Sequence, residues 1–360
     1  MNANRHQLTI GIVGLGTHGT NHTQALRELG HDVLGADADP TIRAEFADRF
    51  GAETFEHPSD LFEESIDAVI ISTPTKFHEP VATKALEAGH AVLLEKPLAH
   101  TIESAERIAD VAERTDQVCM VGFHHRFRNP CIVLKDYIEQ GYLGEISHVQ
   151  ATFLRRRGVP GRGTWYTSKE IAGGGALMDV GSHALDLLLY FCDWPEIEDV
   201  LAQAFSEFGP REDYSYLEMW GEDGDARMYD VEDSANAFLE FENGCTANIE
   251  VAWATNAESL HSYRIRGTEA GAVLDITNTL DEVDPHVDQR NDLTLYEVRG
   301  GAIDHYVDSE VVCRRNDPYR DELTTFLDAV VSDDRPEQNN VHQALAVQRA
   351  VERIYREAGW

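Results

Sequence analysis

The chain has 360 residues, of which 42% are hydrophobic and 9% aromatic, which is typical of a globular protein with room for two domains. Its 64 acidic residues against 30 Lys plus Arg give a formal net charge of -34, which argues against a nucleic-acid partner, since phosphate binding needs a basic surface. No run approaches the roughly 18 apolar residues of a membrane-spanning helix, and a strand pattern begins almost at once, so neither an anchor nor a signal peptide is predicted.

The acidic residues are spread through every segment, and only five of the basic residues are lysines. Dispersed acid with few lysines is typical of proteins from extreme halophiles, where salt screens the repulsion between like charges. The five cysteines are scattered without a CxxC pair, so neither a zinc site nor a disulfide framework is predicted. We therefore expect a halophilic protein of the reducing cytoplasm that carries no metal.

The first third of the chain alternates short apolar runs with helical patterns. Strands are expected at 8–15, 31–37, 66–73, 91–97 and 118–123, and helices at 17–29, 41–50, 79–89 and 101–115. This alternation predicts an α/β domain with a doubly wound parallel sheet. The pattern stops near residue 124, so the first domain is placed at residues 1–124.

The rest of the chain has a different rhythm. A helix at 129–140 and a strand at 146–157 precede a helix at 173–191, and extended runs broken by turns then fill 200–312. Two helices, at 319–331 and 342–359, end the chain. The pattern predicts a second, α+β domain at residues 125–360, with a mostly antiparallel sheet and the C-terminal helices.

A glycine-rich turn follows the first strand and opens the first helix. Gly14, Gly16 and Gly19 have the GxGxxG spacing that allows a tight turn, close approach of a pyrophosphate and close packing of helix on strand. The N–H groups at the helix start, near Thr17 and His18, would hold the phosphates. In this strand–turn–helix context, with the acid described next, a dinucleotide site is favoured over an ordinary turn.

Asp37 ends the second strand, twenty-three residues after Gly14. A carboxylate there can accept hydrogen bonds from the adenosine ribose hydroxyls and repel a 2′-phosphate. The residue therefore favours NAD over NADP, and Arg43 is the nearby cation that would weaken that preference.

Two further strand ends carry polar groups at the edge where ligands lie in open α/β sheets. The first is the segment STPTKFH, with Thr73, Pro74 and His78, which an ordinary strand-to-helix turn would also explain. The second is LLEKP, with Glu95, Lys96 and Pro97. A desolvated lysine can stabilise a developing alkoxide, whereas the alternative is a Glu–Lys pair that caps the strand on the surface.

The segment GGGALMDVGSHALDLLLYF at 173–191 carries a polar stripe on an apolar helix. Asp179, His183 and Asp186 are spaced i, i+4 and i+7, so they lie along one side of the helix. Burying such groups without partners costs several kilocalories, so the stripe must meet partners, water or a ligand. An imidazole has an unperturbed pKa of about 6.5 and suits proton transfer at neutral pH, although a lone histidine is more often a satisfied core residue.

The order GLGTHG, acid after the second strand, STPxxxH, EKP, GFHHRF and GGGxxxDxxxHxxD resembles the glucose–fructose oxidoreductase/inositol dehydrogenase/MocA family. The resemblance covers most of the chain and is strongest over residues 8–195. It implies a Rossmann domain, a second domain with a large open sheet, and an active site between them. It also implies catalytic roles for Lys96, Asp179 and His183, with Asp186 left to a structural role and Glu95 seating the nicotinamide ribose.

The segment RRRGVPGRGTWYTSKEIAGGG resembles the members that act on sugars and polyols. The predicted function is NAD(P)-dependent oxidation of a CH–OH group of a sugar, polyol or sugar derivative by a homo-oligomer, a dimer or tetramer. Two alternatives remain open: an NAD-dependent glycoside hydrolase of the same fold, and a non-catalytic sensor. Besides the three catalytic residues, the residues expected to bind substrate are His125, Arg126, Arg155, Arg157, Trp165 and Tyr166.

Overall fold

The computed structural model describes residues 7–215, 223–277, 292–332 and 334–360, and the chain folds into two compact units. The first unit comprises residues 1–123, 170–173 and 319–348. The second comprises residues 124–169, 174–318 and 349–360.

The first unit contains a six-stranded sheet in the order β3-β2-β1-β4-β5-β6, and all of its pairings are parallel. The strands are β1 (Thr9–Val13), β2 (Asp32–Ala36), β3 (Thr54–Phe55), β4 (Ala68–Ile71), β5 (Ala91–Leu94) and β6 (Cys119–Val121). The helices are α1 (Thr17–Leu29), α2 (Pro40–Phe50), α3 (Pro58–Phe62), the short η1 (Thr75–Phe77), α4 (His78–Glu87) and α5 (Ile102–Thr115). This arrangement confirms the predicted doubly wound sheet.

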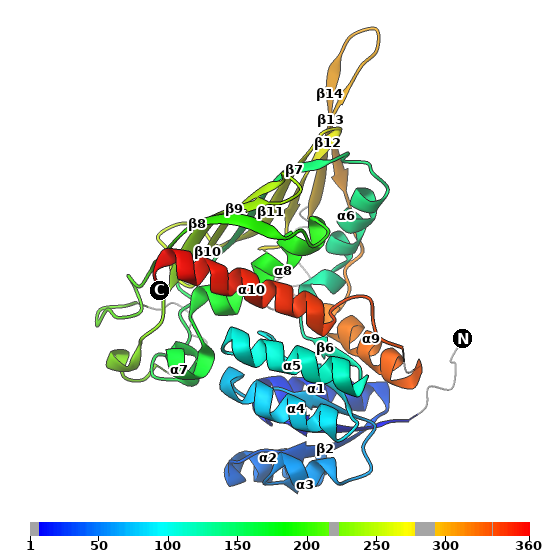
Figure 1. The fold of residues 1–360 in the computed structure, drawn as a ribbon, viewed down its shortest axis with the longest axis vertical. Helices are drawn as coiled ribbons and strands as arrows, with labels where there is room; N and C mark the ends of the chain where they lie inside the picture. Colours follow the sequence, from blue (N-terminus) through cyan, green and yellow to red (C-terminus); the bar gives the residue numbers. More distant parts are fainter. Residues whose placement is uncertain (1–6, 216–222, 278–291, 333) are drawn as a thin grey trace. The chain divides into compact units, whose positions relative to one another are not determined.

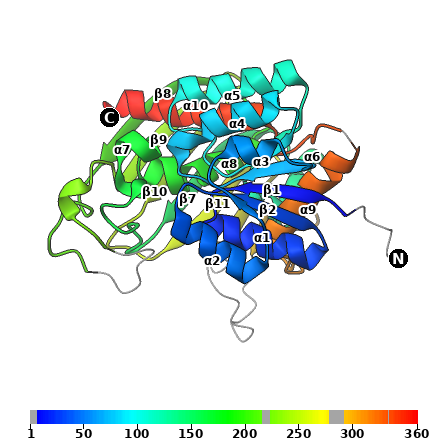
Figure 2. The ribbon, with the colours of Figure 1, turned by 90° about the horizontal axis from the view of Figure 1, so that it is seen from below.

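Local sequence explains these elements. All residues of β4 and β5 are buried, as expected for parallel strands covered on both faces by helices. Asp39 caps α2 by accepting from the N–H of Thr41 at 2.7 Å, and Thr101 caps α5 through the N–H of Ser104 at 3.2 Å. Helices α4 and α5 lie side by side in both views (Figures 1 and 2).

Both C-terminal helices were expected in the second domain, but α9 (Pro318–Ser332) groups with the first unit from residue 319 on, and α10 (Val341–Ala358) is divided between the two units. Residues 319–348 group with the first unit because the turn before α10 extends its sheet. The N–H of Val121 in β6 donates to the carbonyl of Asn339 at 2.9 Å, and the side-chain amide of Asn339 donates to Glu322 at 2.9 Å.

The second unit contains an eight-stranded sheet in the order β14-β13-β12-β11-β7-β10-β9-β8. The β7–β10 pairing is parallel and the other six are antiparallel, so the expected mostly antiparallel sheet is confirmed. Its strands are β7 (Ile146–Leu154), β8 (Ile197–Phe205), β9 (Ser234–Phe241), β10 (Thr246–Ala252), β11 (Leu260–Gly267), β12 (Ala270–Asp275), β13 (Leu293–Arg299) and β14 (His305–Val311).

The helical segments of the second unit are η2 (His124–Phe127), α6 (Asn129–Glu139), η3 (Trp165–Thr167), α7 (Lys169–Ala172), the π-helical turn η4 (Leu177–Gly181), α8 (Ser182–Phe191) and η5 (Ala226–Met228). Every residue of α8 is buried, and α8 packs on β7 and β10. None of the helices in the described parts of the chain is long and apolar enough to cross a membrane.

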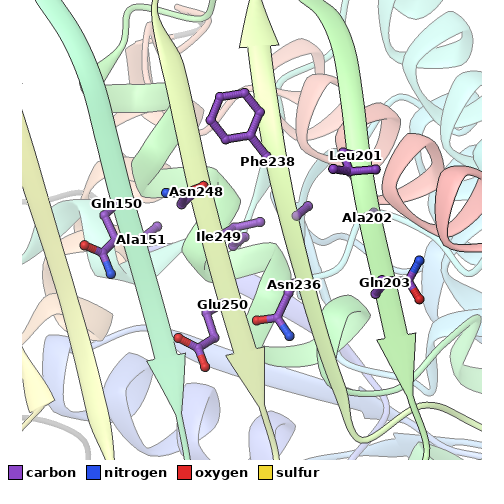
Figure 3. Close-up of a pocket in the computed structure, with 11 residues that line it drawn as sticks. Gln150, Ala151, Leu201, Ala202, Gln203, Asn236, Phe238, Asn248, Ile249 and Glu250 are labelled. Carbon is purple, nitrogen blue, oxygen red and sulfur yellow. The ribbon is translucent and has the colours of Figure 1, made fainter.

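The face of this sheet formed by β7, β8, β9 and β10 carries outward side chains around a shallow pocket (Figure 3). Leu201, Phe238, Asn248 and Gln150 occupy adjacent positions on the four strands. Leu201 is 74% exposed. We call these four residues, with Gln203 and Asn236, the open-face patch.

Candidate active site

The glycine-rich turn of the first unit has the shape that a dinucleotide requires. Gly14 has a φ of 89°, which favours glycine, and an added Cβ would lie 2.8 Å from the backbone of Ser72. A Cβ on Gly19 would lie 2.0 Å from the carbonyl oxygen of Gly14. A Cβ on Gly16 would meet no atom within 4 Å, so this is the open position where a pyrophosphate can approach the backbone. Thr17 and His18, which follow, open α1 without a side-chain cap.

Asp37 lies against this turn. Its two carboxylate oxygens accept from the N–H groups of Leu15 and Asp39, each at 2.9 Å. The guanidinium of Arg43 donates to the carbonyls of Asp37 at 2.7 Å and Ala38 at 3.0 Å. The carboxylate of Asp37 is therefore held beside the glycine turn, and the Arg43 guanidinium is bonded to the backbone of the same segment.

The end of β4 offers a buried polar atom. The hydroxyl of Thr73 is buried and has no hydrogen-bond partner among the described residues. It is therefore available to bind a ligand at the turn that Thr73 forms with Pro74. His78, by contrast, was predicted to bind the cofactor but is a buried link between strand ends. Its ring nitrogens lie 2.9 Å from the carbonyls of Thr73 and Pro97, and burial lowers its pKa. These contacts hold the two strand ends together, and the role of His78 in cofactor binding stays a prediction.

The residues after β5 form a second polar group. Oε1 of Glu95 lies 2.8 Å from Nε2 of His22 and 4.0 Å from Nδ1 of His18, so the carboxylate ties the end of β5 to α1. Lys96, half-buried and directly next to it, precedes Pro97. The roles of Glu95 and Lys96 toward the nicotinamide and the substrate stay predictions.

In the second unit, Asp179 lies in the π-helical turn η4, a rare feature that is frequent at functional sites. Its Oδ2 accepts from the indole N–H of Trp253 at 2.8 Å and lies 4.0 Å from a guanidinium nitrogen of Arg155. Trp253 is fully buried, whereas the Arg155 side chain is partly exposed. Asp179 is thus an oriented carboxylate beside a cation.

His183, in the first turn of α8, packs against other histidines. Its ring centroid lies 4.6 Å from that of His125 and 5.1 Å from that of His124, and His261 of β11 lies 5.0 Å from His125. Nδ1 of His125 accepts from Arg128 at 2.9 Å, so this nitrogen carries no proton and the ring is neutral. Burial, with the neighbouring His124, holds the pKa of His125 well below its usual range. His125 therefore places no positive charge beside His183.

Arg126 was predicted to bind substrate; the structure shows it in a buried ion pair, and a role toward substrate stays a prediction. The residue is fully buried in η2, where its Nε donates to Oδ2 of Asp186 at 2.9 Å and a second nitrogen contacts Oδ1. Its guanidinium also lies 4.6 Å from the ring of Trp194. The pair joins η2 to α8, which is the structural role expected for Asp186.

Arg157, also predicted to bind substrate, has contacts within the protein, and its role toward substrate stays a prediction. Strand β7 ends at Leu154, so the arginines that follow do not alternate as strand residues would. The guanidinium of Arg157 donates to the carbonyls of Arg156 and Thr255 and to the side chain of Asn256, at 2.6 to 2.7 Å. These bonds commit it to joining two loops.

Trp165 and Tyr166 form a half-exposed aromatic platform in η3, with ring centroids 3.7 Å apart and planes inclined at 27°. Such a platform suits the apolar face of a sugar ring. Among the described residues, no group of three or more His, Cys, Asp or Glu side chains is arranged to hold a metal ion.

Sequence reasoning missed four residues of this arrangement. His22 bonds Glu95, Trp253 bonds Asp179, and His124 and His261 complete the histidine cluster. Only His124 carried a local signal, because it lies in the GFHHRF segment. The others come from elements whose neighbours the sequence does not reveal.

Comparisons with known proteins cover both units. Residues 8–123 match the oxidoreductase family with an NAD-binding Rossmann fold, and residues 132–273 match the GFO/IDH/MocA C-terminal domain. The chain is 38% identical to D-glucoside 3-dehydrogenase of Escherichia coli over 210 residues, which is 58% of each chain. It is 31% identical to levoglucosan dehydrogenase of Pseudarthrobacter phenanthrenivorans over 290 residues, covering 74% of this chain and 73% of the relative.

A solved structure of levoglucosan dehydrogenase, in complex with NADH and levoglucosan, has the same fold. It aligns with a TM-score of 0.80 over 98% of each chain at 23% identity. With both domains matched in sequence and a relative matched over most of its length, the chain belongs to the GFO/IDH/MocA family of oxidoreductases.

Proposed function

We propose that the protein is an NAD(P)-dependent dehydrogenase that oxidises a CH–OH group of a sugar, a polyol such as an inositol, or a sugar derivative. The observation that carries the proposal is the environment of His183: a buried imidazole packed against the neutral ring of His125, four residues after the oriented carboxylate of Asp179. Because the His125 ring is neutral, it does not oppose a proton on His183, and this suits His183 to accept one.

The chain's own residues divide the chemistry as follows. His183 accepts the hydroxyl proton, and the Lys96 ammonium stabilises the negative charge that develops on the substrate oxygen. Asp179 accepts a hydrogen bond from the substrate or orients the imidazole. When bound, the nicotinamide dinucleotide accepts the hydride that the CH–OH carbon loses.

We propose NAD as the preferred cofactor because the carboxylate of Asp37 lies beside the glycine turn and would repel a 2′-phosphate. Initial rates with NAD and NADP at equal concentrations test this choice. Asp37→Ala should reduce the preference for NAD and keep activity. A wild-type preference for NADP would contradict the choice and indicate that Arg43 binds the 2′-phosphate.

For the substrate, we propose a neutral sugar or polyol. The stacked rings of Trp165 and Tyr166 offer an apolar surface for a sugar ring, and Arg155 beside Asp179 offers donors to hydroxyl groups. With Arg157 committed to two loops, Arg155 alone of this pair is placed beside a candidate catalytic residue.

The deciding experiment is a product assay at molar salt with NAD and a panel of free inositols, aldoses and glycosides. Net NADH formation, detected by absorbance, with an oxidised sugar as product supports the dehydrogenase. Release of free sugar from a glycoside without net NADH would instead identify the glycoside hydrolase, and NAD binding without any turnover would identify the sensor.

We infer that copies of the chain assemble through the open-face patch (Figure 3). Two copies that each carry a formal charge of -34 repel one another, so association favours a surface whose centre is uncharged. The patch consists of amides and apolar side chains, and the carboxylate of Glu250 lines the same pocket beside Asn236. Leu201→Glu should therefore weaken the assembly at least tenfold in sedimentation experiments, while Val331→Glu, an exposed apolar position on α9, should not. Equal effects, or a wild-type monomer, would contradict the inference.

We also infer that the protein works at high salt in the reducing cytoplasm. The excess of dispersed acid supports the first point, because salt screens the self-repulsion that such a surface creates. The five free thiols support the second.

A further inference from the structure

Glu232 is a fully buried carboxylate that binds the start of the segment carrying Asp179 and His183. Its side chain accepts from the N–H of Gly175 at 2.9 Å and from that of Leu177 at 2.8 Å. Its own carbonyl accepts from the N–H of Ala176 at 3.1 Å. One residue thus satisfies three consecutive N–H groups that the first turn of a helix leaves without intrahelical partners.

Tyr355, on α10, completes this anchor. Its hydroxyl donates to Oε1 of Glu232 at 2.9 Å. A Cβ on Gly174 would lie 2.0 Å from that hydroxyl, and a Cβ on Gly175 would lie 1.9 Å from the carbonyl oxygen of Glu232. Two of the three glycines that precede the apolar helix are therefore required by the close approach of Tyr355 and Glu232.

The anchor is connected to the candidate catalytic carboxylate through one residue. Gly175 donates its N–H to Glu232 and, through its carbonyl oxygen, accepts the N–H of Asp179 at 2.9 Å. The hydroxyl of Ser182, next to His183, in turn donates to the carbonyl of Asp179 at 2.9 Å. A shift of Gly175 would move the backbone that carries both side chains.

We propose that Glu232, supported by Tyr355, is a positioning residue for the reaction: its carboxylate fixes the turn that orients Asp179 and His183. The proposal rests on the dehydrogenase function proposed above. Neither Glu232 nor Tyr355 needs to touch substrate, because both act through the backbone of residues 175–179.

The anchor depends on the ionisation of Glu232. Burial raises the pKa of this carboxyl to about 7, against the opposing effect of the hydrogen bonds from Leu177, Tyr355 and Gly175. Tyr355 is the titratable group that faces it, and burial holds the pKa of this phenol well above its usual range. The adjacent carboxylate of Asp233 binds a different loop, through the N–H groups of Phe208 and Gly209. A protonated Glu232 would have to donate its O–H, so it could no longer accept from all of its present donors.

The test compares Glu232→Gln and Tyr355→Phe with Glu258→Gln, which removes the same charge from an exposed loop. In Glu232→Gln we expect kcat to fall at least tenfold, with the NAD dissociation constant changed less than twofold. Tyr355→Phe removes a donor to the ionised carboxyl and so raises the pKa of Glu232 further, and the acidic limb of its kcat–pH profile should move to higher pH. Glu258→Gln should match the wild type in both measurements.

Amide hydrogen exchange of residues 175–179 gives a readout that does not need turnover, and we expect exchange at least tenfold faster in Glu232→Gln than in the wild type. If the wild type forms no NADH but this exchange difference is found, the proposed function fails and the anchor remains. A folded Glu232→Gln variant with wild-type kcat, pH profile and exchange would overturn the proposal. If Glu232→Gln does not fold, an unshifted pH profile in Tyr355→Phe would overturn it.

Discussion

The indole N–H of Trp253 donates to Oδ2 of Asp179 at 2.8 Å, from a strand end more than seventy residues further along the chain. Replacing Trp253 with Phe removes this donor and keeps most of the buried ring. A hydrogen bond to a charged group contributes about 1.5–3 kcal/mol, so kcat/KM should fall about tenfold or more if Asp179 must hold its orientation in the reaction. Trp360→Phe, at the chain end, is the control. A Trp253→Phe variant with normal kcat/KM would show that Asp179 needs no orienting donor.

The next prediction concerns Lys96 and His183. Lys96→Ala and His183→Ala should each lower turnover by about 10²-fold or more, as expected for loss of an oxyanion-stabilising group or a positioned base. NAD affinity should change little in His183→Ala, since this residue acts on the substrate. Steady-state kinetics and a direct NAD titration measure both quantities. Near-normal turnover in the two variants would refute the assignment of the active site.

The buried carboxyl of Glu232 also predicts how stability depends on pH. Its pKa is about 7 in the folded protein against 4.5 for the ordinary group, so between these values the folded state holds the proton more tightly than the unfolded state. The contribution of Glu232 to the free energy of unfolding is therefore greatest below pH 4.5. It falls by on the order of 3 kcal/mol as the pH rises to 7.

Chemical denaturation of the wild type and Glu232→Gln across this pH range isolates the contribution, because all other groups are shared. The free energy of unfolding of the wild type should decrease relative to that of the variant as the pH rises. A constant difference would mean that Glu232 does not titrate in this range.

The sequence predicted the fold well because alternation of apolar runs with helical patterns reports local structure directly. It missed β3, which has only two residues, and the five-residue α3, because neither is long enough to show a period. The candidate site was predicted less completely. His183 and His261 lie in one cluster because β11 pairs with β7, a neighbour relation that no spacing in the sequence encodes.

The same reason explains why the sequence did not reveal the partners of two arginines. Arg126 lies next to His125 in sequence, yet it turns to the buried carboxylate of Asp186, sixty residues away. Arg157 lies in the strand predicted at 146–157, but β7 has already ended at Leu154. Charged residues take their roles from long-range partners, and these are set by packing that the local pattern does not contain.

The next prediction is that stability requires high salt. The repulsion within a chain of formal charge -34 acts over about 10 Å at 0.1 M salt and about 3 Å at 1 M. Dialysis into dilute buffer should therefore unfold the protein, as followed by circular dichroism, and neutral sucrose should not replace the salt. A protein that stays folded and active without salt would refute the halophile interpretation.

The last prediction separates Arg155 from Arg157. Arg155 lies 4.0 Å from Asp179 with part of its side chain exposed, so Arg155→Ala should raise KM for the sugar about tenfold by removing a charged hydrogen-bond donor. Arg157→Ala should leave KM close to the wild type and lower Tm, because it breaks the two hydrogen bonds, to Thr255 and Asn256, that join two loops.

Each variant should be assayed with free inositols and aldoses and, in parallel, with sugar phosphates and nucleotide sugars. The neutral-sugar proposal expects turnover of the free compounds. Two results together would contradict it: turnover confined to phosphorylated or nucleotide-linked substrates, and a raised KM in Arg157→Ala. They would mean that the Arg157 guanidinium binds an anionic group of the substrate. Arg157 would then have to leave the carbonyls of Arg156 and Thr255 when substrate binds. In that case sugar phosphate would raise the Tm of the wild type but not that of Arg157→Ala.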